Sequence, residues 1–128
     1  MSHVATVEMA VKDLSALEVA SKKLGLLFQR GKETWRSFDS QTNRSTHAIS
    51  VPNSSYDIGV IKTNTGFELK MDEFGSQARV IHERLGMGLA KLKSEYTATV
   101  TTKQLQRQGY RVQRTMQDGR IQLVGVKS

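Results

Sequence analysis

The chain lacks cysteine and has few aromatic residues, which make up 6% of its 128 positions. Without cysteine it can form no disulfide framework, no thiolate nucleophile and no thiolate metal site. It also lacks the apolar run of about 18 residues that a membrane-spanning helix requires. Its first residues alternate apolar and polar, whereas a secretory signal would be continuously apolar. We therefore expect a soluble protein of the cytoplasm that does not bind membranes.

Signatures of catalysis and of cofactor binding are absent as well. His3, His47 and His82 are far apart in the sequence, and Gly86 stands where a second histidine would complete a zinc-binding pair with His82. There is no glycine-rich phosphate loop and no nucleophile elbow. Asp57 would serve as a general base only if the fold placed it in a pocket. The sequence thus predicts no catalytic residue, no metal and no cofactor, and an enzyme with an unrecognised site is the least favoured alternative.

Positive charge is present in excess and is concentrated near the C-terminus. The chain has 19 Lys and Arg residues against 12 Asp and Glu residues, a formal net charge of +7. Residues 91–127 contain only two acidic residues, Glu95 and Asp118, against eight basic ones: Lys91, Lys93, Lys103, Arg107, Arg111, Arg114, Arg120 and Lys127. Such a basic region attracts nucleic acid or an acidic protein face, although many soluble proteins carry a solvated basic face without any ligand.

The first half of the chain predicts strands and one well-defined helix. Residues 4–11 alternate as in a strand, and Asp13 is a helix N-cap for residues 14–24, with Gly25 as the left-handed stop. Residues 26–29 and 34–38 are expected to pair as a short hairpin around residues 30–32. We interpret residues 40–45 as an exposed loop and residues 47–51 as another strand.

The middle of the chain predicts a hairpin followed by a second helix. Residues 56–63 and 67–72 flank Asn64-Thr65-Gly66, which we interpret as a three-residue loop that places Lys62 opposite Glu68. Ser76 is the predicted cap of the second helix, and Gly86 and Gly88 mark a kink or an end in it. The apolar stripe of this helix consists of Ala78, Ile81, Leu85, Leu89 and Leu92.

The last segment predicts a short helix near residues 103–108 and then a hairpin that turns at Asp118-Gly119, the strongest turn signal in the chain. A two-residue loop pairs Met116 with Ile121, Arg114 with Leu123 and Val112 with Gly125. The opposite face of this hairpin should then be solvated, and it carries Arg111, Gln113, Thr115, Gln117, Arg120 and Gln122, with Val124 and Val126 near the far end.

These elements predict a single domain over residues 1–128 with an α+β fold. We expect a two-layer sandwich in which a mainly antiparallel sheet is covered on one side by two or three helices. We expect a non-catalytic accessory or regulatory domain that binds a protein partner through an edge strand or the final hairpin. The alternative is RNA or single-stranded DNA binding through the basic hairpin, with Tyr96 or Tyr110 stacking on a base. In either case the predicted binding residues are Lys103, Arg107, Arg111, Gln113, Arg120 and Gln122. The oligomeric state, the partner's identity and a cellular or phage origin stay open.

Several short motifs also resemble a known family. They are Met1-Ser2-His3, Tyr56-Asp57-Ile58-Gly59, Gly66-Phe67-Glu68-Leu69, Tyr96, Gly109-Tyr110-Arg111-Val112 and Asp118-Gly119-Arg120-Ile121-Gln122-Leu123. Together they are similar to an uncharacterised plastid and cyanobacterial family, domain-of-unknown-function family 1257, named after a conserved chloroplast reading frame. The resemblance implies a small stand-alone domain of bacteria, plastids or their phages, and it brings no activity and no functional residues.

Overall fold

The computed structural model describes residues 3–38 and 43–127. Five strands form one antiparallel sheet in the order β1-β7-β6-β5-β2, and β3–β4 and β8–β9 form two separate two-stranded ribbons. The fold is α+β, as the sequence predicts. The elements are β1 Val4–Val11, α1 Leu14–Lys23, β2 Leu27–Gln29, β3 Thr34–Trp35, β4 Asn43–Arg44, β5 His47–Ser50, β6 Asp57–Thr63, β7 Gly66–Asp72, α2 Gly75–Leu85, the 3₁₀ turn η1 Met87–Leu89, α3 Ala90–Arg107, β8 Tyr110–Gln117 and β9 Arg120–Lys127.

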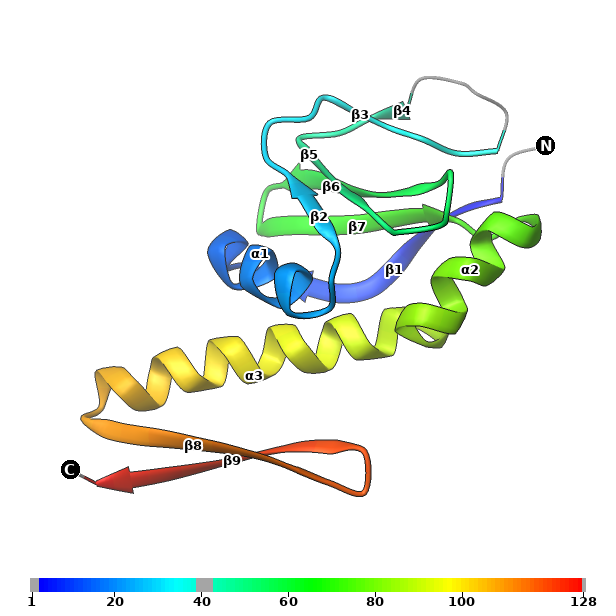
Figure 1. Cartoon of the computed structure of the whole chain (residues 1–128). Helices are drawn as coiled ribbons and strands as arrows, with labels where there is room; N and C mark the ends of the chain where they lie inside the picture. The colour runs from blue at the N-terminus through cyan, green and yellow to red at the C-terminus, as the bar shows by residue number, and fades with distance from the viewer. Residues whose placement is uncertain (1–2, 39–42, 128) are drawn as a thin grey trace.

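The helices cover one face of the five-stranded sheet (Figure 1). Alternate residues of the strands point toward the helices, because successive side chains of a strand face opposite sides of the sheet. Burial of these apolar groups supplies most of the free energy of folding. The sheet contributes Val7, Phe28, Ile49, Ile58, Val60, Leu69 and Met71 to this core, and the helices contribute Leu17, Ile81, Leu85, Leu89 and Leu92.

The other face of the sheet is covered by the segment that carries β3. Trp35, the only tryptophan of the chain, is 3% exposed and its indole lies directly over Gly59 of β6. Arg36 donates to the carboxylate of Asp57 from its backbone N–H at 2.9 Å, from Nε at 3.0 Å and from Nη2 at 2.8 Å. The side chain of Asp57 is therefore used to fix this cover to the sheet.

Three groups join α3 to the turn between β1 and α1. The side chain of Asp13 caps α1 as predicted, since its Oδ1 accepts from the N–H of Ala16 at 2.9 Å. The hydroxyl of Tyr96 on α3 accepts from the N–H groups of Lys12 and Asp13 at 3.0 and 3.1 Å. Nζ of Lys103 lies 3.0 Å from Oδ2 of Asp13. The middle of α3 is thus held against the body of the protein.

The third helix is much longer than predicted. The sequence predicts a second helix whose apolar stripe ends at Leu92 and a separate short helix at about residues 103–108, whereas α3 runs without a break over Ala90–Arg107. Its middle contains five β-branched residues, Thr97, Thr99, Val100, Thr101 and Thr102, whose intrinsic helix propensity is low. Tertiary contacts such as those of Tyr96 overcome this preference. None of the helices in the described residues is long and apolar enough to cross a membrane.

The end of α2 is predicted correctly, but its beginning is not. Gly86 and Gly88 have φ values of 82° and 64°, so they end α2 and form η1 before α3 begins. The N-cap position belongs to Phe74, which makes no side-chain capping bond, and the predicted cap at Ser76 is wrong. Ala78, Ile81 and Leu85 form the buried stripe of α2, as expected.

The hairpin of β6 and β7 has a shorter loop than predicted. Thr63 pairs with Gly66, so the loop is Asn64-Thr65, and Lys62 faces Phe67 and not Glu68. Gly66 belongs to the ladder, and a β-carbon there would collide with a backbone oxygen of neighbouring β1. This register places Val60 opposite Leu69, and both side chains are fully buried. Burial of that pair decides the register against the solvent-exposed ion pair.

The predicted hairpin between residues 26–29 and 34–38 is wrong. Strand β2 pairs with β5, where Phe28 lies opposite Ile49 in the core, and β3 pairs with β4. The chain between β2 and β3 carries Trp35 to the other face of the sheet, so the two segments cannot pair. Of the expected loop at residues 40–45, residues 43–44 form β4 and residues 40–42 lie outside the described residues.

The contact between Trp35 and Gly59 gives a test of this packing. A β-carbon at Gly59 would lie 2.6–2.8 Å from three indole atoms, so Gly59→Ala must displace the ring. We expect a loss of about 1–3 kcal/mol in the free energy of unfolding, measured by urea denaturation followed by circular dichroism. In the Trp35→Leu background the same substitution should cost less than half as much. An equal cost in both backgrounds would contradict the assigned contact.

Candidate nucleic-acid interface

The C-terminal hairpin lies on the far side of α3 from the sheet (Figure 1). Its register is the predicted one, with Met116 opposite Ile121, Arg114 opposite Leu123 and Val112 opposite Gly125. In the described part of the chain neither β8 nor β9 pairs with any other strand. None of their residues belongs to the buried hydrophobic core. The hairpin is therefore a separate layer that packs mainly on α3.

The face of the hairpin toward α3 is apolar but incompletely covered. Tyr110, Val112, Ile121 and Leu123 are half-buried, while Met116 is 61% exposed. A two-stranded hairpin alone is marginally stable in water. These contacts with α3 therefore stabilise it, but weakly.

An ion pair adds a polar attachment between the hairpin and α3. Arg114 donates to both carboxylate oxygens of Glu95, from Nη1 to Oε2 at 2.9 Å and from Nη2 to Oε1. Glu95 is 7% exposed, and the bonds from Arg114 lower the pKa of its carboxyl group. The same pairing raises the pKa of Arg114. Arg114 is thus neutralised on the inner face and does not contribute to a cationic surface.

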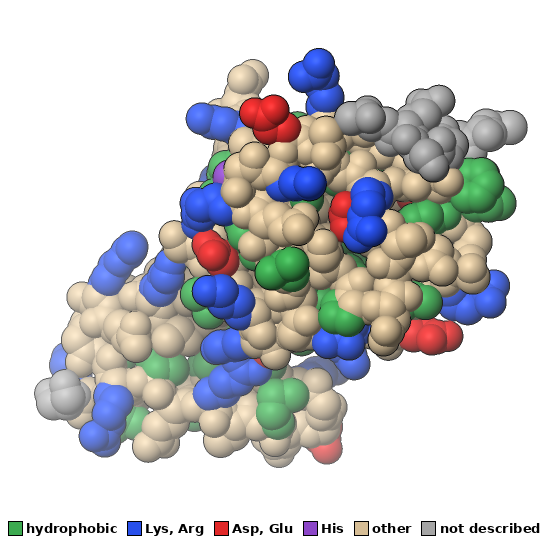
Figure 2. Space-filling model, turned by 45° about the horizontal axis from the view of Figure 1, so that its top comes forward, with side chains coloured by type: hydrophobic (Ala, Val, Ile, Leu, Met, Phe, Trp, Pro, Cys, Tyr) green, Lys and Arg blue, Asp and Glu red, His purple; other side chains and the backbone are tan. Residues whose placement is uncertain are grey.

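Most other cations of this region remain unpaired. Lys103 is bound to Asp13, but no carboxylate of the described residues lies within 4.0 Å of Lys91, Lys93, Arg107, Arg111, Arg120 or Lys127. Figure 2 shows Lys and Arg side chains spread over the lobe that contains α3 and the hairpin. We call the surface formed by α3, β8 and β9 the hairpin lobe. Its single unpaired acid within residues 91–127 is Asp118, at the turn.

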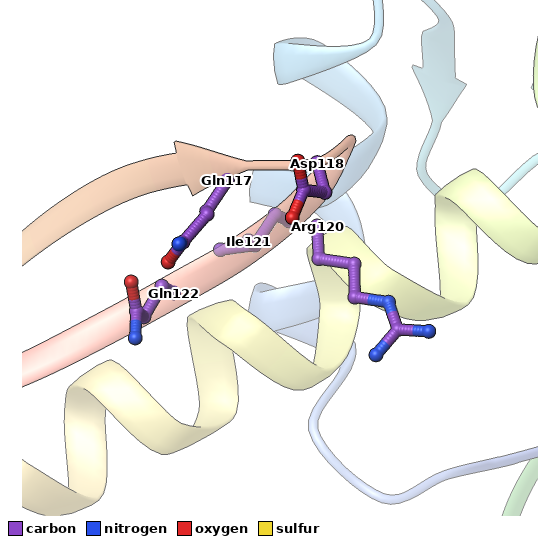
Figure 3. A pocket seen from close by; sticks show the side chains of 5 residues that line it. All are labelled: Gln117, Asp118, Arg120, Ile121 and Gln122. Atoms are coloured by element: carbon purple, nitrogen blue, oxygen red, sulfur yellow. The ribbon is translucent and has the colours of Figure 1, made fainter.

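The outer face of the hairpin carries polar side chains. Arg111, Gln113, Thr115, Gln117 and Gln122 are all exposed. Their one mutual contact is between Thr115 Oγ1 and Gln122 Oε1 at 3.5 Å, a marginal hydrogen bond. Figure 3 shows the amides of Gln117 and Gln122 side by side next to the turn. This face therefore presents amide and guanidinium groups that are free to bind a ligand.

A groove separates α3 from β9. Its volume is about 510 Å³. Arg120 lines this groove and extends away from Gln122 past the edge of the ribbon (Figure 3). The groove has no acidic lining residue among those described and is formed by Lys93, Ser94, Thr97, Ala98, Thr101, Gly119, Arg120, Ile121 and Leu123. Lys, Arg, Ser and Thr side chains are among those that contact phosphate oxygens in nucleic-acid complexes, and this groove contains all four types.

The predicted binding residues are only partly brought together. Arg111, Gln113 and Gln122 share the outer face, Arg120 lines the groove, and Arg107 is the last residue of α3. Lys103 is engaged with Asp13, so its charge is not displayed with the others. Sequence reasoning missed the hydroxyls of Ser94, Thr97 and Thr101. Their helical spacing of three and four residues is the signal, but the sequence pattern predicts no helix between Leu92 and residue 103.

Asp57, the candidate general base, and His47 are both engaged inside the fold. Asp57 is 2% exposed and is bound by Arg36. Nδ1 of His47 accepts from the N–H of Gly31 at 2.8 Å, and burial lowers the pKa of this imidazole. Among the residues that the structure describes, no three acidic or histidine side chains are grouped so as to hold a metal. These contacts give both residues structural roles.

A second exposed surface lies at the start of α2. The rings of Phe38 and Phe74 pack edge to face with centroids 4.5 Å apart, and the two residues are 53% and 39% exposed. They border a pocket of about 540 Å³ whose lining also includes Arg36, Tyr56 and Gln77. Large exposed aromatic groups in contact are unusual for a surface without a partner.

Comparison with known proteins gives one match. A family model described as "Protein of unknown function (DUF1257)" matches residues 20–124. No curated protein and no solved structure matches the chain.

The ion pair of Glu95 and Arg114 makes the hairpin sensitive to acid. Because the folded pKa of Glu95 lies below its usual 4.5, the stabilisation is complete above pH 4.5 and is lost as the pH falls through the folded pKa. Glu95→Gln should lower the free energy of opening the hairpin by about 1–2 kcal/mol at pH 7, a modest value because Arg114 is partly solvated. Amide hydrogen exchange of residues 110–127 measures this opening.

The control for this prediction is Glu68→Gln. Glu68 lies 3.7 Å from Lys70 in a solvent-accessible pair, so its substitution should leave the exchange of the hairpin amides unchanged. If Glu95→Gln accelerated exchange equally in the five-stranded sheet and in the hairpin, Glu95 would stabilise the whole domain and not this attachment.

Proposed function

Since the chain belongs to the DUF1257 family, whose description names no activity, we propose a function from the geometry of the chain itself: it is a non-catalytic domain that binds nucleic acid through the hairpin lobe. The observation that carries this proposal is the set of six unpaired cations that α3, β8 and β9 display against a single unpaired acid. Binding to a polyanion releases condensed counterions, which favours association with such a surface.

The types of side chain on the lobe also support a nucleic acid over an acidic protein. Interfaces between proteins usually have an apolar or aromatic centre. The apolar side chains on the outer face of the hairpin are those of Val124, 45% exposed, and half-buried Val126, both toward the open end, and Arg, Gln and Thr occupy the rest of that face. The groove beside it combines Lys93 and Arg120 with three hydroxyl groups. This combination suits phosphates and bases better than a folded protein surface.

The proposal is tested by the salt dependence of binding. The protein should bind a 24-nucleotide DNA probe of mixed sequence at 50 mM salt, and log Kd should rise linearly with the logarithm of the salt concentration. Arg111→Ala combined with Arg120→Ala should reduce that slope by about two and weaken binding at least tenfold. Fluorescence anisotropy titrations at four salt concentrations measure both quantities.

The matched control removes two exposed cations from the opposite end of the molecule. Lys32→Ala with Arg44→Ala changes the net charge equally, but Arg44 belongs to β4 and lies far from the hairpin (Figure 1). This variant should bind as the unmodified protein does, with at most a twofold change. Equal weakening by both double variants would mean that net charge alone attracts the probe, and the hairpin lobe would not be the site.

A protein partner at the surface of Phe38 and Phe74 is the second candidate function. It is favoured by the two exposed rings in contact beside a pocket. If a partner binds there, a protein recovered from the native host with the unmodified domain should also be recovered with Arg111→Ala/Arg120→Ala and be lost with Phe38→Ala. Met87→Ala is the control, because Met87 is 74% exposed and lies outside this surface. Recovery that does not depend on Phe38 would exclude this surface.

A further inference from the structure

We propose that the hairpin reads the major groove of double-stranded B-form DNA with its outer face. This inference rests on the proposed nucleic-acid binding and names the ligand class for the same lobe. The proposed ligand is a DNA duplex whose base edges the protein contacts. Single strands, double-stranded RNA and acidic proteins are the competing ligands that the experiments below separate.

The dimensions of the hairpin fit this groove. Each strand has eight residues paired in register from Tyr110 with Lys127 to Gln117 with Arg120. Two such strands lie about 4.8 Å apart and extend roughly 24 Å. The major groove of B-form DNA is about 12 Å wide and admits a two-stranded ribbon with its side chains. Because α3 covers the inner face, the outer face can enter the groove with the helix behind it as a rigid support.

The outer face carries the side chains that distinguish bases. Amides of Asn or Gln can bind the N6 and N7 atoms of adenine together, and Arg can bind O6 and N7 of guanine. Gln113, Gln117 and Gln122 supply three such amides and Arg111 supplies a guanidinium, all exposed. Thr115 lies between them, opposite Gln122. These amides can donate to phosphates, but they are neutral and add no long-range attraction to the backbone, so their concentration on one face favours contacts with bases.

The cations lie at both ends of the hairpin. Lys127 pairs with Tyr110 at the open end, where α3 ends at Arg107. Arg120 follows the turn at the other end and shares the groove with Lys93. Contacts to phosphates flanking the major groove would set the orientation of the ribbon, while the amides between them contact the bases.

Stacking on single-stranded bases finds less support in the lobe. Sequence-tolerant binding of single strands requires exposed aromatic rings. Within residues 90–127 none of the described aromatic side chains is among the large exposed apolar groups: Tyr96 is 9% exposed and Tyr110 is half-buried over Gly125. A-form RNA is also disfavoured, since its major groove is too deep and narrow for side chains to read.

The first experiment compares three ligands of the same sequence by anisotropy at 150 mM salt. A 24-base-pair DNA duplex should bind at least tenfold tighter than either its single strand or the RNA duplex. Preference for the single strand or for RNA would overturn the major-groove assignment and leave nucleic-acid binding by the lobe standing. If the protein bound none of the three ligands even at 50 mM salt, the proposed function itself would fail.

The second experiment tests base reading. Selection from a randomised duplex pool should enrich a defined sequence, and replacement of its purines by 7-deazapurines, which removes the N7 acceptors of the major groove, should weaken binding at least tenfold. Gln113→Ala with Gln122→Ala should lose the preference for the enriched duplex over a random one by at least tenfold while keeping the salt slope. Asn64→Ala with Thr65→Ala, which replaces two exposed polar residues of the β6–β7 loop outside the hairpin lobe, is the control. Enrichment of no sequence, or indifference to the 7-deazapurines, would contradict base reading.

Discussion

The position of α3 is the constraint on which both halves of this molecule depend. Two neighbouring residues of this helix bind different layers of the molecule. Tyr96 binds the turn between β1 and α1, and Glu95 binds Arg114 of the hairpin. Adjacent residues of a helix point about 100° apart, so one turn of α3 can serve two layers. The core holds the helix through Leu92 and Tyr96, and the helix in turn supports a hairpin that would be marginal alone.

The same arrangement decides which charges are available to a ligand. Glu95 and Asp13 each engage one cation, Arg114 and Lys103, so those two positive charges act in folding. The remaining cations of the hairpin lobe have no carboxylate of the described residues within 4.0 Å, so they form no ion pair. Composition alone treats all eight basic residues of the lobe as equivalent. The structure shows that two of them form ion pairs within the fold and that six form none with the residues described. Net charge is consequently a poor guide to the binding surface, and the pairing pattern is a better one.

Sequence patterns predicted the elements whose signals are local. Asp13 as a cap, the Asp118-Gly119 turn and the register of β8 with β9 depend on neighbouring residues, and all three are observed. The failures are positions where distant contacts decide. The extent of α3 depends on tertiary packing around a run of β-branched residues, the loop before Gly66 depends on the approach of β1, and the partner of β2 depends on Phe28 entering the core. In the hairpin lobe, alternation along the strands predicted which residues lie on the outer face. The groove could not be predicted, because one of its walls is the part of α3 for which the sequence predicts no helix.

The separation of the hairpin from the hydrophobic core has a further consequence for how such a domain can diversify. Outward-facing positions such as Gln113 and Gln122 bury nothing and support no other element, so exchanging them leaves the folding equilibrium almost untouched. Under the proposed function, substitutions at these positions could change the ligand preference of the hairpin without compensating changes in the sheet and helices. On the same proposal, relatives with the same sheet and helices could recognise different ligands, and such differences would fall on β8 and β9.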